Sequence, residues 1–276
     1  MDKVSSEAKR HMCLRRCVHG VWRWFSLATL FQNSPHDRIF LRPLKFPASP
    51  SSFSSKNVSE TGRATMGAQS DLNGTPLTPL SAIAEALERL AKSLDSGPRG
   101  DLRLSSFAEA CSHLSVLFGC LGVAFKFAEI DFVAKVHDLL EASKTFGSLK
   151  DVLDHDIRHG TVKKAGSHSR NLRRVRQGLD LIRVLFEQFL SSKGSSLKDP
   201  ASRAYAQVCA PFHSWAVRKT VAAGMYALPT REQLLVKLNE TEYSVVKKMK
   251  RYIDASEPII RHVDKLFISK NISLDW

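Results

Sequence analysis

From Thr78 to the end of the sequence, apolar residues recur at the spacing of an α-helix, and this periodicity restricts the fold more than any other feature. Thr78 is a typical N-cap residue, and Pro79 follows at the first helical position. Apolar residues between Leu80 and Leu94 then fall on one helical face, and Gly97-Pro98 ends the segment. No stretch alternates apolar and polar residues with β-branched enrichment. The sequence therefore predicts an all-α protein.

The same periodicity predicts the helices that follow. Ser106 with Glu109 has the spacing of a capping box that opens a helix, and the stretch from Leu114 to Phe125 is apolar on nearly every side, which is typical of a buried helix. Further helices are predicted over Ile130–Ala142, Ser148–Arg158, His168–Ser191, Pro200–Ala227, Thr230–Ala255 and Glu257–Ser269. Because no unit of 30 to 50 residues repeats, we expect one compact multi-helix domain over residues 78–276.

The first 65 residues have a different composition. They hold 11 lysine and arginine residues against 4 acidic ones, which is half of the net charge of +14 of the whole chain. They also contain a Ser/Pro-rich run at 47–55, and their apolar residues do not recur at the spacing of a helix or a strand. We expect a disordered basic leader over 1–65 and a linker over 66–77. An organelle transit peptide and an upstream extension ahead of a start at Met66 both fit this composition.

Several classes of protein lack support in the sequence. The five cysteines are odd in number and lack paired metal-ligand spacing, which argues against a disulfide framework or a zinc module and favours a reducing compartment. The apolar stretch that ends at Lys126 is shorter than the roughly 20 residues of a membrane span. No phosphate-binding loop, nucleophile elbow, zinc-protease or kinase motif occurs. We therefore expect no enzyme, no catalytic residues, no cofactor and no bound metal.

Five polar residues stand out within the helical pattern. Asp131 and Lys135 are four residues apart, as are Arg170 and Arg174, so each pair shares one helical face. Two guanidinium groups on one face can bracket a phosphate. Taken singly, the first pair also fits a surface ion pair, the arginines a solvated basic face, and His213 a histidine satisfied in the core.

In this order and at these separations, the Asp131–Lys135 pair, the Arg170–Arg174 pair and the His213-x-Trp215 element resemble the glycolipid transfer protein family. The resemblance runs from about Leu80 to Trp276 and is closest to the ceramide-1-phosphate branch. It implies a two-layer all-α sandwich of about eight helices, with the lipid headgroup at a surface cationic site and the hydrocarbon chains in an interior pocket. The implied function is non-enzymatic transfer of sphingolipids between membranes.

The resemblance also implies a role for each of these residues. Asp131 would bind the lipid amide, His213 the amide carbonyl, and Lys135, Arg170 and Arg174 the phosphate. Arg174 stands where the glycolipid-binding branch has a tryptophan that stacks on sugar, which favours phosphate over sugar. The charges agree, because Asp131 and the three cations sum to +2 and a phosphate monoester carries about −1.5 to −2. Phosphatidic acid lacks the amide N–H, so its binding would leave the carboxylate without a donor.

The remaining expectations concern the chains, the membrane and partners. Phe118, Phe125 and Phe132 are candidates to line the chain pocket, although each also fits an ordinary core position. Trp215 is a candidate for the membrane interface, where its ring has one wet and one apolar edge. We expect a monomeric carrier that docks transiently on membranes from the cytoplasm, unless residues 1–65 direct it to an organelle.

Two alternatives stay open at this point, a glycolipid carrier and a lipid sensor or scaffold without net transport, because all need a similar pocket. Nucleic-acid binding is not expected, since half of the basic excess lies in the leader and no binding module occurs.

Overall fold

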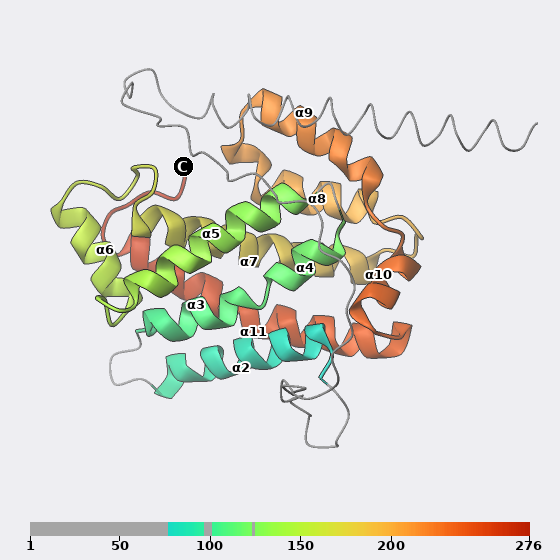
Figure 1. The fold of residues 1–276 in the computed structure, drawn as a ribbon, viewed down its shortest axis with the longest axis horizontal. Helices are drawn as coiled ribbons and strands as arrows, with labels where there is room; N and C mark the ends of the chain where they lie inside the picture. The colour runs from blue at the N-terminus through green and yellow to red at the C-terminus, as the bar shows by residue number, and fades with distance from the viewer. Residues whose placement is uncertain (1–76, 97–100, 123–124) are drawn as a thin grey trace, which may run out of the picture. The chain divides into compact units, whose positions relative to one another are not determined.

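The computed structural model describes residues 77–96, 101–122 and 125–276, and these residues form helices joined by loops (Figure 1). The helices are α2 (Pro79–Ser96), α3 (Leu104–Ser112), α4 (Ser115–Cys120), α5 (Lys126–Ala142), α6 (Leu149–Arg158), α7 (His168–Ser191), α8 (Lys198–Val208), η2 (Ala210–Phe212), α9 (Trp215–Gly224), η3 (Met225–Ala227), α10 (Arg231–Leu238) and α11 (Glu242–Ile268). Two isolated bridges are the only β-type pairings among the described residues. The prediction of an all-α fold is confirmed, whereas the predicted leader over 1–65 and nearly all of the linker lie outside the described residues.

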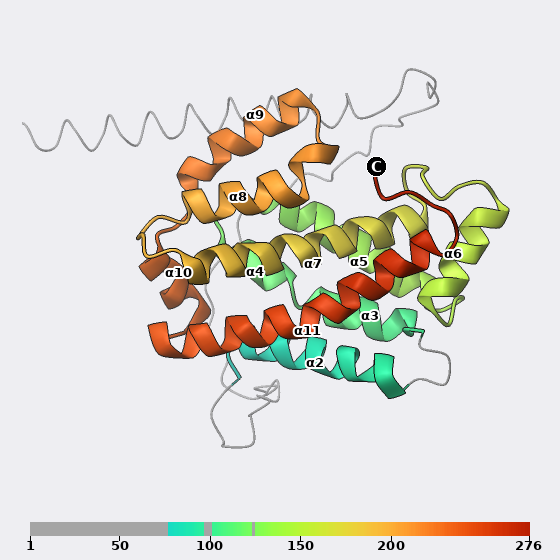
Figure 2. The same ribbon diagram turned by 180° about the vertical axis from the view of Figure 1, so that it is seen from behind.

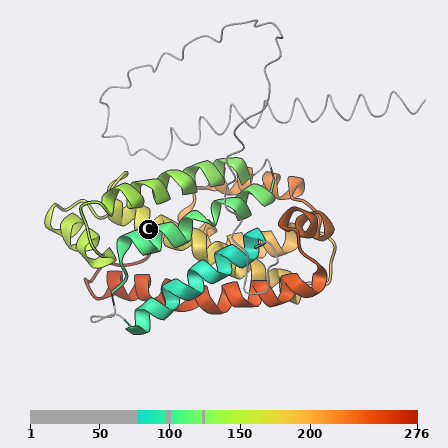
Figure 3. The same cartoon turned by 60° about the horizontal axis from the view of Figure 1, so that its bottom comes forward.

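The helices form two layers, as the resemblance implied. Helices α2, α3, α4 and α5 lie toward the viewer in Figure 1. Figure 2 shows the opposite side, where α7, α8 and α11 lie toward the viewer. Helix α11 packs against both α2 and α7, and α7 packs in turn against α5 and α8. Figure 3 shows the α2 and α11 contact from below. Helix α7 therefore carries contacts of both layers, which places its side chains on several different interfaces.

Three predicted helix starts agree with the structure because the caps are present. The Ser81 amide donates to Thr78 Oγ1 over 3.3 Å, ahead of the first turn of α2. Ser148 and Asp151 form a reciprocal capping box at α6. The bounds of α7 coincide with the predicted range, and Ser167 caps it through the Arg170 amide.

The predicted capping box at Ser106 and Glu109 is wrong. Helix α3 begins at Leu104, after an N-cap residue, Arg103, that makes no side-chain cap. The Leu104 amide donates instead to the Gly147 carbonyl over 3.1 Å. A carbonyl distant in the sequence thus satisfies a free N–H of the first turn, which a local pattern cannot reveal.

The predicted buried helix from Leu114 to Phe125 is also wrong. Helix α4 covers only part of this stretch, and it ends before Gly122, whose φ of 91° is a conformation that favours glycine. Val116 is 46% exposed, while Leu114, Leu117 and Phe118 are buried. Only one face of α4 packs against the rest of the protein. The other face is exposed to solvent even though its residues are apolar.

The two predicted long helices near the C-terminus divide at other points. The range Pro200–Ala227 separates into α8, η2, α9 and η3 around Pro211, which has no N–H to continue the helix. The range Thr230–Ala255 is broken at Asn239, which adopts a left-handed conformation with φ 54°. No break occurs where one was predicted beyond Ala255, because α11 continues through Pro258 and buries Ile259 and Ile260 against the core.

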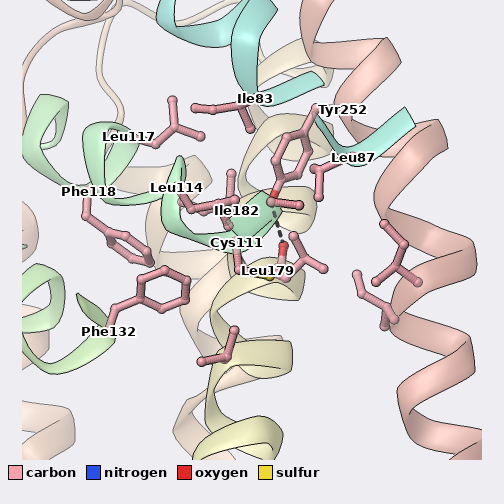
Figure 4. Packing of buried hydrophobic residues seen from close by; sticks show 14 of the residues in the cluster. Ile83, Leu87, Cys111, Leu114, Leu117, Phe118, Phe132, Leu179, Ile182 and Tyr252 are labelled. Carbon is pink, nitrogen blue, oxygen red and sulfur yellow. Dashed lines mark hydrogen bonds between the residues drawn. The ribbon is translucent and has the colours of Figure 1, made fainter. Parts of the chain in front are cut away.

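The core between the layers is tightly packed. Figure 4 shows Tyr252, whose hydroxyl donates to the Leu179 carbonyl over 3.0 Å. A small apolar cavity of about 10 Å³ lies between α4, α7 and α10. It is lined by Leu117, Leu121, Ile182, Leu185, Phe186, Phe189, Leu197, Leu234 and Leu238. This volume is about that of one water-sized sphere, so the cavity is too small for a hydrocarbon chain in this structure.

Within the described ranges, no helix combines the length and apolarity that crossing a bilayer requires.

Candidate functional site

The five predicted polar residues come together from three elements. Asp131 and Lys135 lie on α5, Arg170 and Arg174 on α7, and His213 follows η2. Burial lowers the pKa of Arg174, and the nearby charge of Arg170 lowers it further, while Asp131 acts in the opposite direction. Burial likewise lowers the pKa of His213, with a further contribution from Arg174 and an opposing one from Asp131. We call these five residues the polar cluster.

Asp131 and Lys135 form the exposed side of the polar cluster. The ammonium of Lys135 donates to Asp131 Oδ1 one helical turn earlier. The Asp131 side chain is 70% exposed and the Lys135 side chain 20% exposed. An ion pair this accessible contributes at most about 1 kcal/mol to stability. A ligand that binds Asp131 or Lys135 and breaks this ion pair therefore costs the protein little stability.

Arg170 places positive charge in the first turn of α7, the unfavourable end for a cation, and Arg174 follows one turn later. The first turn of α7 contains no acidic residue, although the N-terminal end of a helix dipole favours anions by about 0.3 to 1 kcal/mol each. Arg170 Nη1 donates to the Lys163 carbonyl over 2.8 Å, and Arg174 Nη1 donates to Gln177 Oε1 over 2.8 Å. Both acceptors are uncharged. The two guanidinium groups thus keep their charge available for an anion.

The neighbouring arginines of α7 have carboxylate partners. Arg176 donates to Asp180 Oδ2 over 2.7 Å and to Asp264 of α11. Arg173 is 4% exposed, and its Nη1 lies 4.0 Å from Asp264 Oδ1. These residues face α11, on a different side of the helix from the polar cluster. Of the four arginines in this part of α7, Arg173 and Arg176 are therefore paired with carboxylates, and Arg170 and Arg174 are available to bind an anion.

His213 has a defined ring orientation. Its Nδ1 lies 2.9 Å from the Tyr205 hydroxyl. Burial raises the pKa of Tyr205 to about 12, so the hydroxyl keeps its proton at neutral pH and can pair with either tautomer of the ring. In the tautomer that carries its proton on Nε2, the Tyr205 hydroxyl donates to Nδ1 and Nε2–H is a donor for a ligand. Sequence reasoning missed Tyr205, because the contact crosses the break between α8 and η2.

Gln177 is a second residue that sequence reasoning missed. Its Oε1 accepts from Arg174, and its Nε2 donates to the Val208 carbonyl at the end of α8 over 2.9 Å. It therefore orients Arg174 and joins α7 to the segment that leads to His213. The i+3 spacing from Arg174 was a visible signal for this contact.

Two of the three aromatic candidates, Phe118 and Phe132, pack against each other next to the polar cluster. Phe132 follows Asp131, and its ring lies 5.1 Å from that of Phe118; Figure 4 shows the two rings pointing toward each other. A Cβ on Gly178, one turn beyond Arg174, would lie 2.6 Å from Phe132 Cε2. Glycine at 178 therefore allows this ring to pack against the α7 backbone. Phe125 is half-buried at the N-cap of α5.

Trp215 lies apart from this core. It is the first residue of α9, it is 64% exposed, and α9 buries none of its residues. Lys219 Nζ lies 5.8 Å from the centre of the Trp215 ring. Figure 1 shows α9 at the edge of the helical layers, beside α8. An exposed helix with a tryptophan and a lysine side by side has the composition of a membrane-interface element.

A family model described as "Glycolipid transfer protein (GLTP)" matches residues 102–240, half of the chain. The chain belongs to the glycolipid transfer protein family. Two relatives are from Arabidopsis thaliana. The "ACD11 homolog protein" is 61% identical over 204 residues, covering 72% of this chain and 89% of the relative. "Accelerated cell death 11" is 51% identical over 199 residues, covering 72% of this chain and 96% of the relative.

The structural comparison agrees with the sequence comparison. A crystal structure of an Arabidopsis accelerated-cell-death 11 mutant complexed with C12 ceramide-1-phosphate has a TM-score of 0.70 and 50% identity, covering 72% of this chain and 99% of that chain. The apo form of the same relative has a TM-score of 0.66 and 51% identity, covering 70% and 98%. The resemblance to this family that the polar residues indicated is thereby confirmed.

In this member of the glycolipid transfer protein family, the lowered pKa of His213 predicts a pH dependence of stability. The ordinary histidine pKa is about 6.5, so below that pH the unfolded chain takes up a proton before the folded protein does. The wild type should thus lose stability relative to His213→Gln as the pH falls from 7 to 5, and the difference should be constant above about pH 7. Urea unfolding of both proteins at pH 8, 7, 6 and 5 measures this. A difference that grows in favour of the wild type on acidification would contradict it.

Proposed function

We propose that this protein carries ceramide-1-phosphate between membranes without changing the lipid chemically. The observation that carries the proposal is the convergence of Lys135, Arg170 and Arg174 beside Asp131 and His213, with a net charge of +2. This charge matches a phosphate monoester at neutral pH. A neutral sugar headgroup would leave the two uncompensated guanidinium groups without an anion. A relative that is 50% identical was crystallised as a mutant in complex with C12 ceramide-1-phosphate, which supports the proposal.

Recognition of the headgroup follows from the donors and acceptors in the polar cluster. Lys135, Arg170 and Arg174 bind the phosphate oxygens, and the two arginines do so with planar forks. The carboxylate of Asp131 accepts the amide N–H of the sphingoid base, and His213 Nε2–H donates to the amide carbonyl. The N–H and the C=O of the lipid amide are thereby both hydrogen-bonded. Phosphatidic acid has no amide N–H, so this pairing discriminates against it.

The hydrocarbon chains enter the core behind the polar cluster. Phe118 and Phe132 lie between the layers beside the cluster, and Leu117, next to Phe118, lines the closed apolar cavity. Because this cavity holds about 10 Å³, chain entry has to move these side chains apart. The lipid then replaces the protein–protein apolar contacts with protein–lipid contacts of similar free energy. Phe125, half-buried at the start of α5, is the third residue assigned to this pocket.

Membrane docking is assigned to α9. Trp215 lies at the headgroup level, and Arg218 and Lys219 of the same helix favour anionic lipids by about 1 kcal/mol each. The carrier acts as a monomer at cytoplasmic membrane surfaces and leaves after exchange, because one short helix gives reversible binding only.

The substitution Trp215→Ala should lower the transfer rate about 10-fold. Loss of the buried part of an indole ring at the interface costs about 1.5 kcal/mol. The measurement is transfer between vesicles together with sedimentation of the protein with vesicles. Tyr243→Ala is a matched control, since Tyr243 is 86% exposed on α11. Binding of a short-chain ceramide-1-phosphate in solution should stay unchanged, and a loss of that binding would place Trp215 in the ligand site instead.

The function itself is tested by transfer of labelled lipids between vesicles, with ceramide-1-phosphate, galactosylceramide and phosphatidic acid in parallel. We expect rapid transfer of ceramide-1-phosphate, slow transfer of phosphatidic acid and none of galactosylceramide. Transfer of galactosylceramide at a similar rate would favour a glycolipid carrier. Tight binding of ceramide-1-phosphate without transfer would favour a sensor or scaffold.

A further inference from the structure

The last residues of the chain fold back toward the polar cluster. After α11 ends at Ile268, Asn271 adopts a left-handed conformation with φ 56°, and the Ile272 amide donates to the Phe267 carbonyl over 3.1 Å. The Trp276 ring packs edge-on against Phe267 at 6.1 Å. Figure 2 shows this segment running from the end of α11 past α6. We call residues 272–276 the tail segment.

One link between the tail segment and the polar cluster is Lys163, in the loop between α6 and α7. Its ammonium lies 3.4 Å from Ser273 Oγ and 5.6 Å from the centre of the Trp276 ring. Its main-chain carbonyl accepts the hydrogen bond from Arg170 Nη1 over 2.8 Å. The same residue is thus held by the tail segment through its side chain and holds a phosphate-binding arginine through its main chain.

A second link runs through Arg173. Its Nη2 donates to the Leu274 carbonyl over 3.0 Å, and its guanidinium carbon lies 5.7 Å from the centre of the Phe212 ring. Phe212 directly precedes His213. Nε and Nη1 of Arg173 are buried without a hydrogen-bond partner in the described part of the chain. Asp264 lies too far from Arg173 for a hydrogen bond, at 4.0 Å. The tail segment therefore supplies a hydrogen bond to a buried guanidinium whose donors are costly to leave unsatisfied.

We propose that the tail segment positions the headgroup site, with Lys163 as the positioning residue that transmits its effect to Arg170. This inference rests on the proposed function. A fixed 159–167 loop presents the Lys163 carbonyl in one place, so the Arg170 guanidinium is ordered before the phosphate arrives. Without that contact, the long side chain has to be ordered on binding, and the lost rotamer freedom reduces affinity.

The test compares single substitutions in the same loop. Lys163→Met removes the ammonium but keeps the stem and the carbonyl, and Lys163→Arg keeps a cation for the Trp276 ring. Lys164→Met is the matched control, because Lys164 is an exposed neighbour with the same charge. By calorimetry with short-chain ceramide-1-phosphate in the absence of membranes, Lys163→Met should weaken binding about 3- to 10-fold. The other two variants should stay within about twofold, with unchanged melting temperatures.

Two further arms separate positioning from other effects. In an Arg170→Met background, Lys163→Met should cause no additional loss, because the group that it positions is gone. NMR of the arginine side chains without lipid should show higher mobility of the Arg170 guanidinium in Lys163→Met, with Arg174 unchanged. This second arm does not depend on the proposed function, which fails separately if the wild type binds no ceramide-1-phosphate. Equal losses from Lys163→Met and Lys164→Met, an undiminished loss in the Arg170→Met background, or unchanged Arg170 mobility would overturn the inference.

Discussion

Replacing Arg174 with leucine should reduce ceramide-1-phosphate transfer roughly 30- to 150-fold while the protein stays folded. Arg174 is half-buried, and its hydrogen-bond acceptor within the protein, Gln177, is uncharged, so a bound phosphate receives the full benefit of a charge-assisted bond. Such a bond contributes about 2 to 3 kcal/mol. The leucine variant also lowers the net charge of the polar cluster from +2 to +1. Transfer between vesicles and binding in solution should fall together.

The matched control for this prediction is Arg89→Leu. Arg89 is exposed on α2, and Figure 1 shows α2 on the opposite side of the helical layers from α9. The control removes one positive charge from the protein but none from the polar cluster, so transfer should change less than twofold. Similar losses in the two variants would attribute the effect to general charge, and normal transfer by Arg174→Leu would remove Arg174 from the site.

Replacing Arg176 with methionine should destabilise the protein by about 3 kcal/mol. The Arg176 side chain is 13% exposed and binds both Asp180 on its own helix and Asp264 on α11. Removing the cation leaves Asp180 paired with Arg183 alone and Asp264 with only the longer contact to Arg173, so the poorly solvated interface keeps both carboxylates but loses the cation that joins them. Urea unfolding monitored by circular dichroism measures the free energy of unfolding.

Arg261→Met is the control for the Arg176 prediction. Arg261 pairs with Glu257 on the exposed face of α11, with both side chains more than half exposed, and its loss should cost less than about 1 kcal/mol. At a temperature where Arg176→Met is folded, its preference for ceramide-1-phosphate over phosphatidic acid should match the wild type. A loss below about 1 kcal/mol for Arg176→Met would show that the interface admits water.

The two arginine predictions illustrate what local spacing can and cannot resolve. Arg170 and Arg174 share a face by their spacing, and so do Arg170 and Arg173, because residues three and four apart are neighbours on a helix. Spacing alone therefore does not separate Arg173 from the polar cluster. It does not say which face meets α11 and which meets solvent. That depends on Asp264, about 90 positions away, and on the packing of α11 across α7.

The errors in the predicted helices have a common cause. The capping box at Ser106 failed because Gly147 supplies the acceptor for the first turn of α3, and the continuous helix through Pro258 persists because its flanking residues are buried. The stretch from Leu114 to Phe125 was predicted to be buried on all sides, yet Val116 faces solvent. In the first two cases tertiary contacts outweighed a local preference, of about 1 kcal/mol at the cap and about 3 kcal/mol at the proline. In the third, the packing left one side of an apolar helix without a neighbour.

The sequence by itself determined the all-α class and the bounds of α7, because helical periodicity and caps are local properties. It also picked out the five residues of the polar cluster, through their resemblance to the family. Only the tertiary structure decided that Tyr205 orients His213, that Gly178 admits the Phe132 ring, and that the tail segment holds Lys163 beside Arg170. These contacts join residues on different elements. Their geometry is set by how the two layers pack, and packing is a property of the whole chain rather than of any segment.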